Sequence, residues 1–164
     1  MTLIKDLSMA IQSGGLLMFR FRGQTLQVLL AHPGGPYWAK KDLASWSIPK
    51  GLFEKDEQAL DAAKREFKEE TSFEPKGDFI ELMPLKQKSG KIVHCWAFQG
   101  DCDPSALKSN TFSMEWPPDS DKQSEFPEID RADWFDIPAA KQKILPGQAP
   151  FLDELCQKLN YTPK

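Results

Sequence analysis

Long apolar runs are missing from this sequence. None approaches the roughly 18 residues that a membrane-spanning helix requires. The apolar stretch over residues 3–11 is interrupted by Lys5, Asp6 and Ser8, and it lacks the basic start and small-residue cleavage site of a secretory signal. Internal repeats and low-complexity blocks are absent as well. We therefore expect a soluble, cytoplasmic protein with no membrane partner.

Cysteine is scarce, and charge of one sign is weak. Cys95, Cys102 and Cys156 are an odd number at spacings that match no zinc or redox motif, so reduced thiols in a reducing compartment explain them. Lysine and arginine total 21 against 24 aspartate and glutamate, for a net charge of -3. This balance argues against a general nucleic-acid binder, although a local basic patch stays open. No nucleic-acid partner is expected.

The length of 164 residues fits one domain. A chain of this size buries roughly 70% of its unfolded surface, which is enough for a hydrophobic core without disulfides or metals. The hydrophobic fraction of 40% and the charged fraction of 27% are ordinary globular values. We expect a single domain over residues 1–164, with residues 1–12 as an N-terminal extension of uncertain structure.

Apolar patterning predicts two strand pairs. The segments 14–21 and 26–32 flank a break at Gly23 and form the first pair. The segments 79–86 and 92–99 form the second pair around residues 88–90. Between the pairs, a Pro/Gly-rich loop is expected over 32–41 and an extended piece over 46–51. Later in the chain, a loop with at most one strand is expected over 101–126, and a strand end over 133–137.

Two helices complete the expected fold. The first spans 57–71, where Leu60, Ala63 and Phe67 recur at i, i+3 and i+7. The second spans 149–159 and places an apolar stripe inward. Strands interleaved with helices at this length predict the α/β class, with a mixed sheet sandwiched between helices. The inward residues of the second helix are Phe151, Leu152, Leu155 and Leu159.

The first helix carries a group of acids. Glu66, Glu69 and Glu70 are related by i, i+3 and i+4, so their carboxylates converge on one face, where they repel one another. A hard divalent cation removes that repulsion and prefers oxygen ligands; Mg²⁺ in particular keeps positions for water and substrate phosphates. The alternative is a solvated helix face laced with charges, which is what most such runs are.

The wider frame favours the metal site. From Gly51, five residues lead to Glu57 and seven more to Arg65, followed by Glu66, an apolar residue, any residue, Glu69 and Glu70. This resembles the Nudix box, glycine-x5-glutamate-x7-arginine-glutamate-apolar-x-glutamate-glutamate-x-glycine-apolar. Every defined position of residues 51–73 matches except the last glycine, which is Ser72. Glycine there usually supplies a left-handed helix cap, so the substitution should cost about 1 kcal/mol if the backbone is kept.

The resemblance implies a Nudix-type α/β/α sandwich and roles for the box residues. Glu66, Glu69 and Glu70 would bind Mg²⁺, or alternatively Mn²⁺, with the backbone carbonyl of Gly51 completing the coordination. In some members the residue equivalent to Glu66 is also proposed as a base. Arg65, with Glu57, would orient these carboxylates. The family reaction is attack of water on a phosphorus of a diphosphate linkage, and family members are often dimers, so a homodimer is one expected assembly.

Candidate substrate-binding residues lie before the box. Lys50 is placed to clamp a phosphate, or else is a solvated loop lysine. Tyr37 and Trp38 either stack on a nucleobase or cover the edge of the core, and Lys41, with Lys40, would meet phosphates. The segment 46–51, Trp-Ser-Ile-Pro-Lys-Gly, resembles the approach to the box in diadenosine tetraphosphate hydrolases of the family.

Other titratable residues are weaker candidates. Family members often place a further acid in the C-terminal half, as a metal ligand or general base. Glu128 is favoured over Glu125 for this role, against the alternative of an acidic loop with no such role. His94 lies in an apolar segment and reads as a core histidine with satisfied hydrogen bonds, whereas His32 is undecided.

Two functions remain. The first is a metal-dependent pyrophosphohydrolase that cleaves a diphosphate linkage in a small nucleotide. Dinucleoside polyphosphates and nucleoside triphosphates come first as substrates, and ADP-ribose-type compounds third. The second is a catalytically silent nucleotide-binding module on the same fold. Such modules usually lack one or more box glutamates, and this chain has all of them.

Overall fold

The computed structural model describes residues 11–163. Most of the extension expected over residues 1–12 lies outside these residues. Its last residue, Gln12, opens the first strand. No helix within the described part of the chain is both long and apolar enough to cross a membrane.

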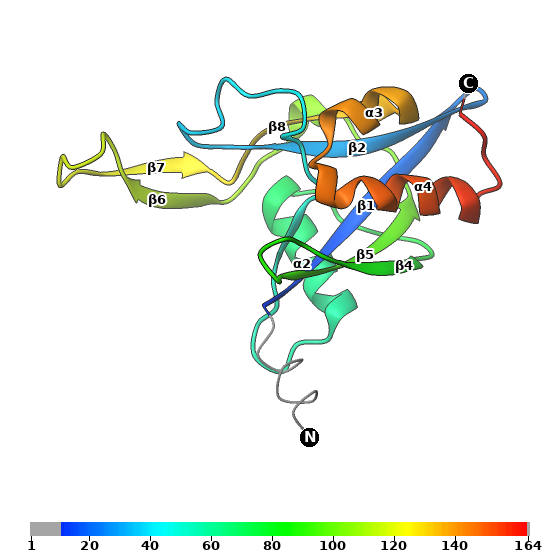
Figure 1. The fold of residues 1–164 in the computed structure, drawn as a ribbon, viewed down its shortest axis with the longest axis horizontal. Coiled ribbons are helices and arrows are strands. Elements are labelled where there is room, and N and C mark those ends of the chain that lie inside the picture. Colours follow the sequence, from blue (N-terminus) through cyan, green and yellow to red (C-terminus); the bar gives the residue numbers. More distant parts are fainter. Residues whose placement is uncertain (1–10, 164) are drawn as a thin grey trace.

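A mixed sheet forms the centre of the fold (Figure 1). Its strand order is β4-β5-β1-β2-β8, and the short β3 pairs with the beginning of β1. The β1–β5 pair is parallel and the other pairs are antiparallel, so the sheet is mixed as predicted. The strands are β1 (Gln12–Arg22), β2 (Thr25–Pro33), β3 (Lys50–Leu52), β4 (Ile80–Lys86), β5 (Ile92–Gln99) and β8 (Ile129–Asp136).

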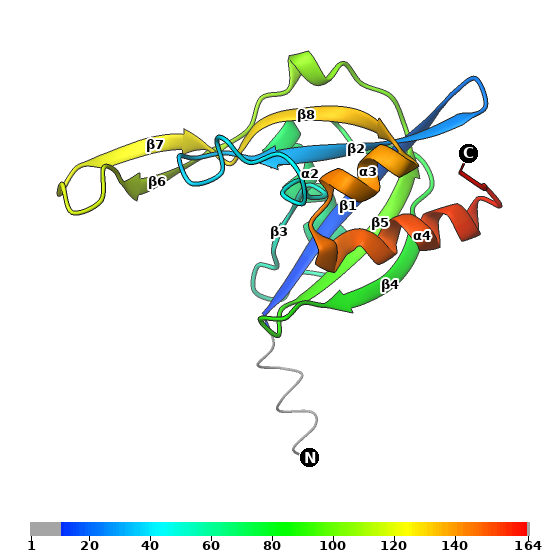
Figure 2. The same cartoon turned by 45° about the horizontal axis from the view of Figure 1, so that its top comes forward.

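Helices cover both faces of the sheet (Figure 2). Along β1, Leu17 and Phe19 enter a core with α3 (Ile137–Lys143) and α4 (Ala149–Lys158). Leu16 and Met18 point to the opposite face and enter a core with α2 (Ala59–Thr71). Side chains of a strand alternate between its faces, so the continuous apolar run Leu16–Phe19 in the centre of β1 belongs between two layers. The predicted α/β/α sandwich is confirmed.

The segment over 101–126 departs from the prediction. It holds a two-stranded hairpin of β6 (Thr111–Glu115) and β7 (Gln123–Pro127), not a loop with at most one strand. The prolines, serines and aspartates that favoured a loop are concentrated in the turn over 116–122 and hide the short strands on either side. A 3₁₀ turn over Pro104–Ala106 precedes the hairpin.

The helices differ from expectation in three places. Helix α2 begins at Ala59 instead of Glu57, because the Glu57 N–H closes a turn onto the Glu54 carbonyl (3.1 Å) and Asp56 has a positive φ of 63°. Helix α3 was not predicted; Asp136 caps it by accepting from the Ala139 N–H at 2.9 Å. Helix α4 ends one residue early, and Leu159 is only partly buried against the core.

Ser72 ends α2 in the left-handed conformation that glycine would supply. Its φ and ψ are 65° and 6°, and its N–H donates to the Lys68 carbonyl at 2.8 Å. We expect Ser72→Gly to stabilise the protein by about 1 kcal/mol, since it removes the Cβ strain of this conformation. The thermal unfolding temperature would then rise by about 2–4 °C for a chain of this size. Ser72→Ala keeps the Cβ and is the matched control; an equal rise in both variants would contradict the argument.

Candidate functional site

The box residues lie where β3 meets α2. In β3, Lys50 and Gly51 pair with Gly15 and Gly14 of β1, and α2 packs over the same part of β1. A Cβ on Gly14 would lie 2.8 Å from the Ala59 carbonyl oxygen, so the glycine lets the helix start sit against the strand. The glycines of β1 therefore bring β3 and the acidic helix together.

Arg65 is the centre of a network of carboxylates. Its Nε and Nη2 donate to the two Glu57 carboxylate oxygens at 2.8 and 2.9 Å, which is the bidentate geometry of a strong pair. Its Nη1 donates to Glu66 at 2.8 Å and to Glu69 at 3.2 Å. Nη2 also donates to the Leu52 carbonyl at 3.1 Å, which ties the helix to the end of β3. One guanidinium thus orients two of the three box acids.

Gly51 makes room for Glu66. A Cβ built on Gly51 would overlap the Glu66 carboxyl group. Its φ is not positive, unlike that of Gly23 or Gly90, so the backbone conformation does not require glycine there. The requirement for glycine at this box position therefore comes from the close approach of the carboxylate.

The acids differ in their electrostatic surroundings. Hydrogen bonds from Arg65 lower the pKa of Glu57 to about 2. Burial raises the pKa of Glu70 to about 9, with contributions from the negative charges of Glu66 and Glu128 and in opposition to Lys50. Burial also raises the pKa of Glu66, against the opposing effect of Arg65. The Arg65 guanidinium stabilises the negative charge of Glu57. At Glu66 and Glu70, the nearby positive charges do not offset the effect of burial.

The donor set suits a hard divalent cation. The Gly51 carbonyl and the carboxylates of Glu66, Glu69 and Glu70 offer only oxygen atoms, and the raised pKa values mark a charge deficit that a cation would fill. Within residues 11–163, no three acidic, histidine or cysteine side chains surround a single point as they stand. Arg65 contacts two of these acids, with its Nη1 2.8 Å from Glu66 and 3.2 Å from Glu69.

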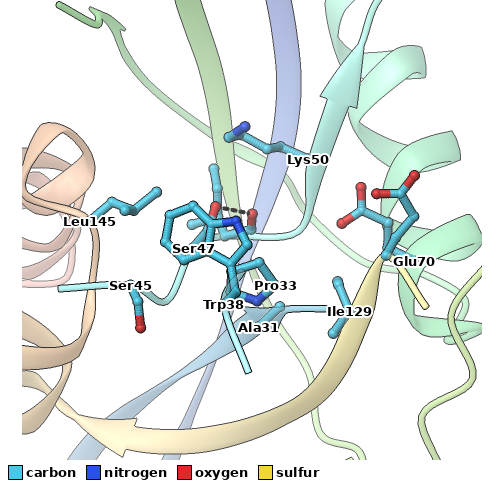
Figure 3. Close-up of a pocket in the computed structure, with 11 residues that line it drawn as sticks. Ala31, Pro33, Trp38, Ser45, Ser47, Lys50, Glu70, Ile129 and Leu145 are labelled. Atoms are coloured by element: carbon cyan, nitrogen blue, oxygen red, sulfur yellow. Dashed lines mark hydrogen bonds between the residues drawn. The ribbon is translucent and has the colours of Figure 1, made fainter. Parts of the chain in front are cut away.

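A cavity opens next to these acids (Figure 3). It brings together residues from β2, the following loop, β3, α2 and the start of β8. Figure 3 shows the Trp38 ring, the Lys50 amine and the Glu70 carboxylate arranged around it. Its wall also includes Ser47, Leu145 and Glu128. A cation for phosphate, acids for a metal and a flat aromatic ring therefore share one cavity.

Lys50 is poised inside this cavity. Burial lowers the pKa of its amine to about 8, and the nearby charge of Lys91 lowers it as well, while Glu70 and Glu66 act in the opposite direction. The solvated-loop alternative does not describe this surrounding. A buried amine held beside a second lysine gains from an anion, which is the environment of a phosphate contact.

The two aromatic residues of the loop over 34–41 have separate places. Trp38 lines the cavity, and the Lys41 amine sits over its ring, 4.8 Å from the centroid. Tyr37 does not line this cavity; its side chain is 59% exposed and its ring meets Trp116 edge-to-face at 5.4 Å. Lys40 and Lys41 are both exposed. The alternative in which both rings cover the edge of the core does not fit Tyr37.

The two candidate acids outside the box, Glu125 and Glu128, lie in different places. Glu128 reaches the cavity and raises the pKa of Glu70. Glu125 lies on the hairpin strand β7, exposed, and pairs in register with Ser113. The structure therefore brings Glu128, and not Glu125, to the side of the box acids.

The histidines are both hydrogen-bonded. His94 is half-buried, and its Nε2 lies 2.7 Å from the Gln12 side-chain oxygen. His32 is fully buried; its Nε2 donates to the Lys41 carbonyl at 2.6 Å and its Nδ1 lies 2.8 Å from the Asp130 carboxylate. His32 thereby fastens the end of the loop that carries Trp38 to strands β2 and β8. No local sequence pattern predicts this contact with Asp130, which is distant along the chain.

The β6–β7 hairpin contributes residues that were not predicted from the sequence. Phe112 and Met114 of β6 line a second cavity beside the first. Their spacing with Trp116, every second residue, is a strand signal that could have identified them. The expectation of a loop obscured it.

The α/β/α sandwich and the acidic helix α2 are the features expected of a Nudix-type protein. Comparisons with known proteins identify the family. The NUDIX domain family model matches residues 12–155. The chain therefore belongs to the Nudix family, as the box predicted, and is a Nudix hydrolase. A comparison with curated proteins finds no match.

Solved structures show the same fold at low sequence identity. A *Caenorhabditis elegans* Ap4A hydrolase in a binary complex is 20% identical, with a TM-score of 0.64 over 90% of this chain and 98% of that one. The NUDIX domain of *Shewanella oneidensis* NrtR, solved with ADP ribose, is 16% identical, with a TM-score of 0.64 over 97% and 99%. A mutT/nudix family protein from *Listeria innocua* is 18% identical, with a TM-score of 0.61 over 92% and 94%.

Proposed function

We propose that this protein hydrolyses a diphosphate linkage in a small nucleotide, using a divalent cation. One observation carries the proposal: Lys50, Glu70, Glu128 and Trp38 line one cavity next to the carboxylates that Arg65 orients. Each part of a nucleoside diphosphate has a counterpart there. The amine suits phosphate, the acids suit a metal and the indole suits a base.

The metal would be held by the Gly51 carbonyl and by Glu66, Glu69 and Glu70, with Mg²⁺ first and Mn²⁺ as the alternative. Such an ion activates water and neutralises charge on phosphate oxygens. Arg65 positions the acids, and Lys50 binds the chain of phosphates. We assign to Glu128, which lines the same cavity, the role of taking a proton from the attacking water or of contributing a further oxygen ligand.

We propose dinucleoside polyphosphates and nucleoside triphosphates as the first substrate classes. The segment 46–51 supports the former, and its residues Ser47 and Lys50 line the cavity. The similarity to *C. elegans* Ap4A hydrolase supports the same class, although at 20% identity it extends to the fold alone. Trp38 would stack on one base, with Lys41 beside it.

The rival function is nucleotide binding without turnover. *S. oneidensis* NrtR shares the fold and was solved with ADP ribose and with a 27mer DNA. Two features of the present chain favour the enzyme. All of the box acids are present, and Arg65 holds two of them in position.

The test is phosphate release in the presence of Mg²⁺, coupled to an added phosphatase. The panel contains nucleoside triphosphates, diadenosine polyphosphates, ADP-ribose and oxidised guanine nucleotides. We expect turnover on one class, its loss on addition of a chelator and its return with excess Mg²⁺. If a folded, metal-supplied protein binds a nucleotide but releases no phosphate from any of the panel, the silent binding module replaces the enzyme.

A further inference from the structure

A second cavity adjoins the first, between the loop after β2 and the β6–β7 hairpin. The two cavities share Pro33, Trp38 and Glu128, so one continuous hollow surface runs past the Trp38 ring. We call the second one the hairpin cavity. Its wall includes Pro33, Gly35, Tyr37, Trp38, Phe112 and Met114.

The hairpin presents one apolar face to this cavity. Phe112 and Met114 are two residues apart on β6, and alternate residues of a strand share a face. Trp116 continues the same spacing, and its ring meets Tyr37 edge-to-face at 5.4 Å. The Phe112 ring lies against Gly35, where an added Cβ would be 3.0 Å away.

The hairpin is fastened to the loop at its base. The Gly34 N–H donates to the Glu128 carbonyl at 2.9 Å, and a Cβ on Gly34 would overlap the Pro127 carbonyl. The Glu128 N–H in turn donates to the Asn110 carbonyl at 2.9 Å, which joins the residue after β7 to the residue before β6. Figures 1 and 2 both show the hairpin extending away from the sheet beside this loop. The hairpin therefore supplies a fixed wall.

The chemistry of the hairpin cavity differs from that of the first cavity. Among residues 11–163, those that line it include no lysine or arginine, so phosphate has no cationic partner there. Three aromatic rings and a methionine suit a flat, uncharged ring. Tyr37 is 59% exposed, so much of its surface is open to a ligand.

We propose that the hairpin cavity binds the second nucleobase of a dinucleoside polyphosphate. The phosphate chain lies at Lys50 and Glu70, the first base stacks on Trp38 in the first cavity, and the second base enters between Tyr37 and Phe112. This inference rests on the proposed function and deepens it, since it assigns the substrate class. A mononucleotide fills only one of the two cavities.

The experiment compares diadenosine tetraphosphate with adenosine tetraphosphate. The second compound has the same number of phosphates and lacks one adenosine. Phe112→Leu removes the aromatic face and keeps an apolar side chain. We expect KM for the dinucleotide to rise by about 5- to 150-fold, the range for losing one stacked base, and KM for the mononucleotide to change by less than about twofold. Phe112→Tyr keeps the ring and should restore the dinucleotide KM.

Phe126→Leu is the matched control. Phe126 pairs with Phe112 across the hairpin (ring centroids 6.0 Å apart) but does not line the cavity. Equal changes for both substrates, no change for either, or the same effect from Phe126→Leu would overturn the inference. Titration calorimetry of both nucleotides runs in parallel. If the wild type binds them without turnover, the proposed function fails, and the affinity difference between Phe112→Leu and Phe126→Leu still decides the role of the hairpin cavity.

Discussion

Glu70→Gln is expected to lower kcat/KM by about 10²- to 10³-fold, the scale of losing one preorganised electrostatic group in an active site. Glu70 is the box acid that lines the cavity with Lys50, and burial raises its pKa to about 9 in the absence of a cation. The carboxylate is thus held where its charge is costly unless a cation compensates it. Glutamine has the same size but is a much weaker ligand for a hard ion.

The fold should tolerate this change. A pKa of about 9 keeps Glu70 neutral near pH 7 when no metal is bound, and glutamine is neutral and of the same size, so the thermal unfolding temperature without added metal is expected to stay the same or rise. Glu74→Gln is the matched control, because Glu74 is exposed and, among residues 11–163, forms its ion pair with Lys68 alone, at 2.9 Å. It should keep full turnover. If Glu70→Gln retains more than about a tenth of the wild-type rate under saturating Mg²⁺, Glu70 is not a metal ligand in the reaction.

Combining Glu69→Gln with Glu70→Gln separates the enzyme from a silent binder. The enzyme loses turnover, and Lys50 and Trp38 still provide contacts for a nucleotide. A protein whose only task is nucleotide binding would show no turnover before the change and keep its affinity after it. Turnover and affinity therefore have to be measured on the same preparation.

The sequence predicted the parts of the fold that are set by local patterning. The apolar runs of β1 and β2 and the helical stripe through Phe67 each identify an element from neighbours a few residues away. The resemblance to the box implied that Arg65 orients the carboxylates, and its i,i+4 spacing from Glu69 agrees with the contact between them. The contact of Arg65 with the adjacent Glu66 does not follow from helix spacing. The mismatch at Ser72 left open whether the left-handed end that glycine usually supplies is kept, and the structure keeps it.

Other parts of the site depend on tertiary contacts that a local pattern cannot report. The first cavity joins Trp38, Glu70 and Leu145, which lie far apart in the chain and meet only because the sheet brings β2, β8 and α2 together. His32 finds Asp130 across the β2–β8 pair for the same reason. The strands of the β6–β7 hairpin were not predicted, because the many prolines, serines and aspartates over 101–126 indicated a loop. The alternation of Phe112, Met114 and Trp116 was the weaker signal.

Gly51→Ala is expected to reduce turnover by about 10²-fold or more while leaving every ligand type in place. The added methyl group would overlap the Glu66 carboxyl group, which must move away from its position 2.8 Å from the Arg65 Nη1. Alanine keeps the backbone carbonyl at position 51, and the φ there is not positive. The change therefore tests the placement of Glu66 and not the loss of a ligand or backbone strain.

Overpacking of this kind typically lowers the free energy of unfolding by about 1–3 kcal/mol, so thermal unfolding is measured beside kcat and the Mg²⁺ concentration for half-maximal rate. Gly100→Ala is the matched control, since an added Cβ there has its nearest neighbours at 3.4 and 3.5 Å, ordinary contact distances, and φ is again not positive. It should change neither rate nor metal requirement. A Gly51→Ala protein that unfolds earlier but turns over normally would show that the close approach of Gly51 to Glu66 serves packing alone. A rate loss with a higher Mg²⁺ requirement would show that the glycine sets the position of a metal-binding carboxylate.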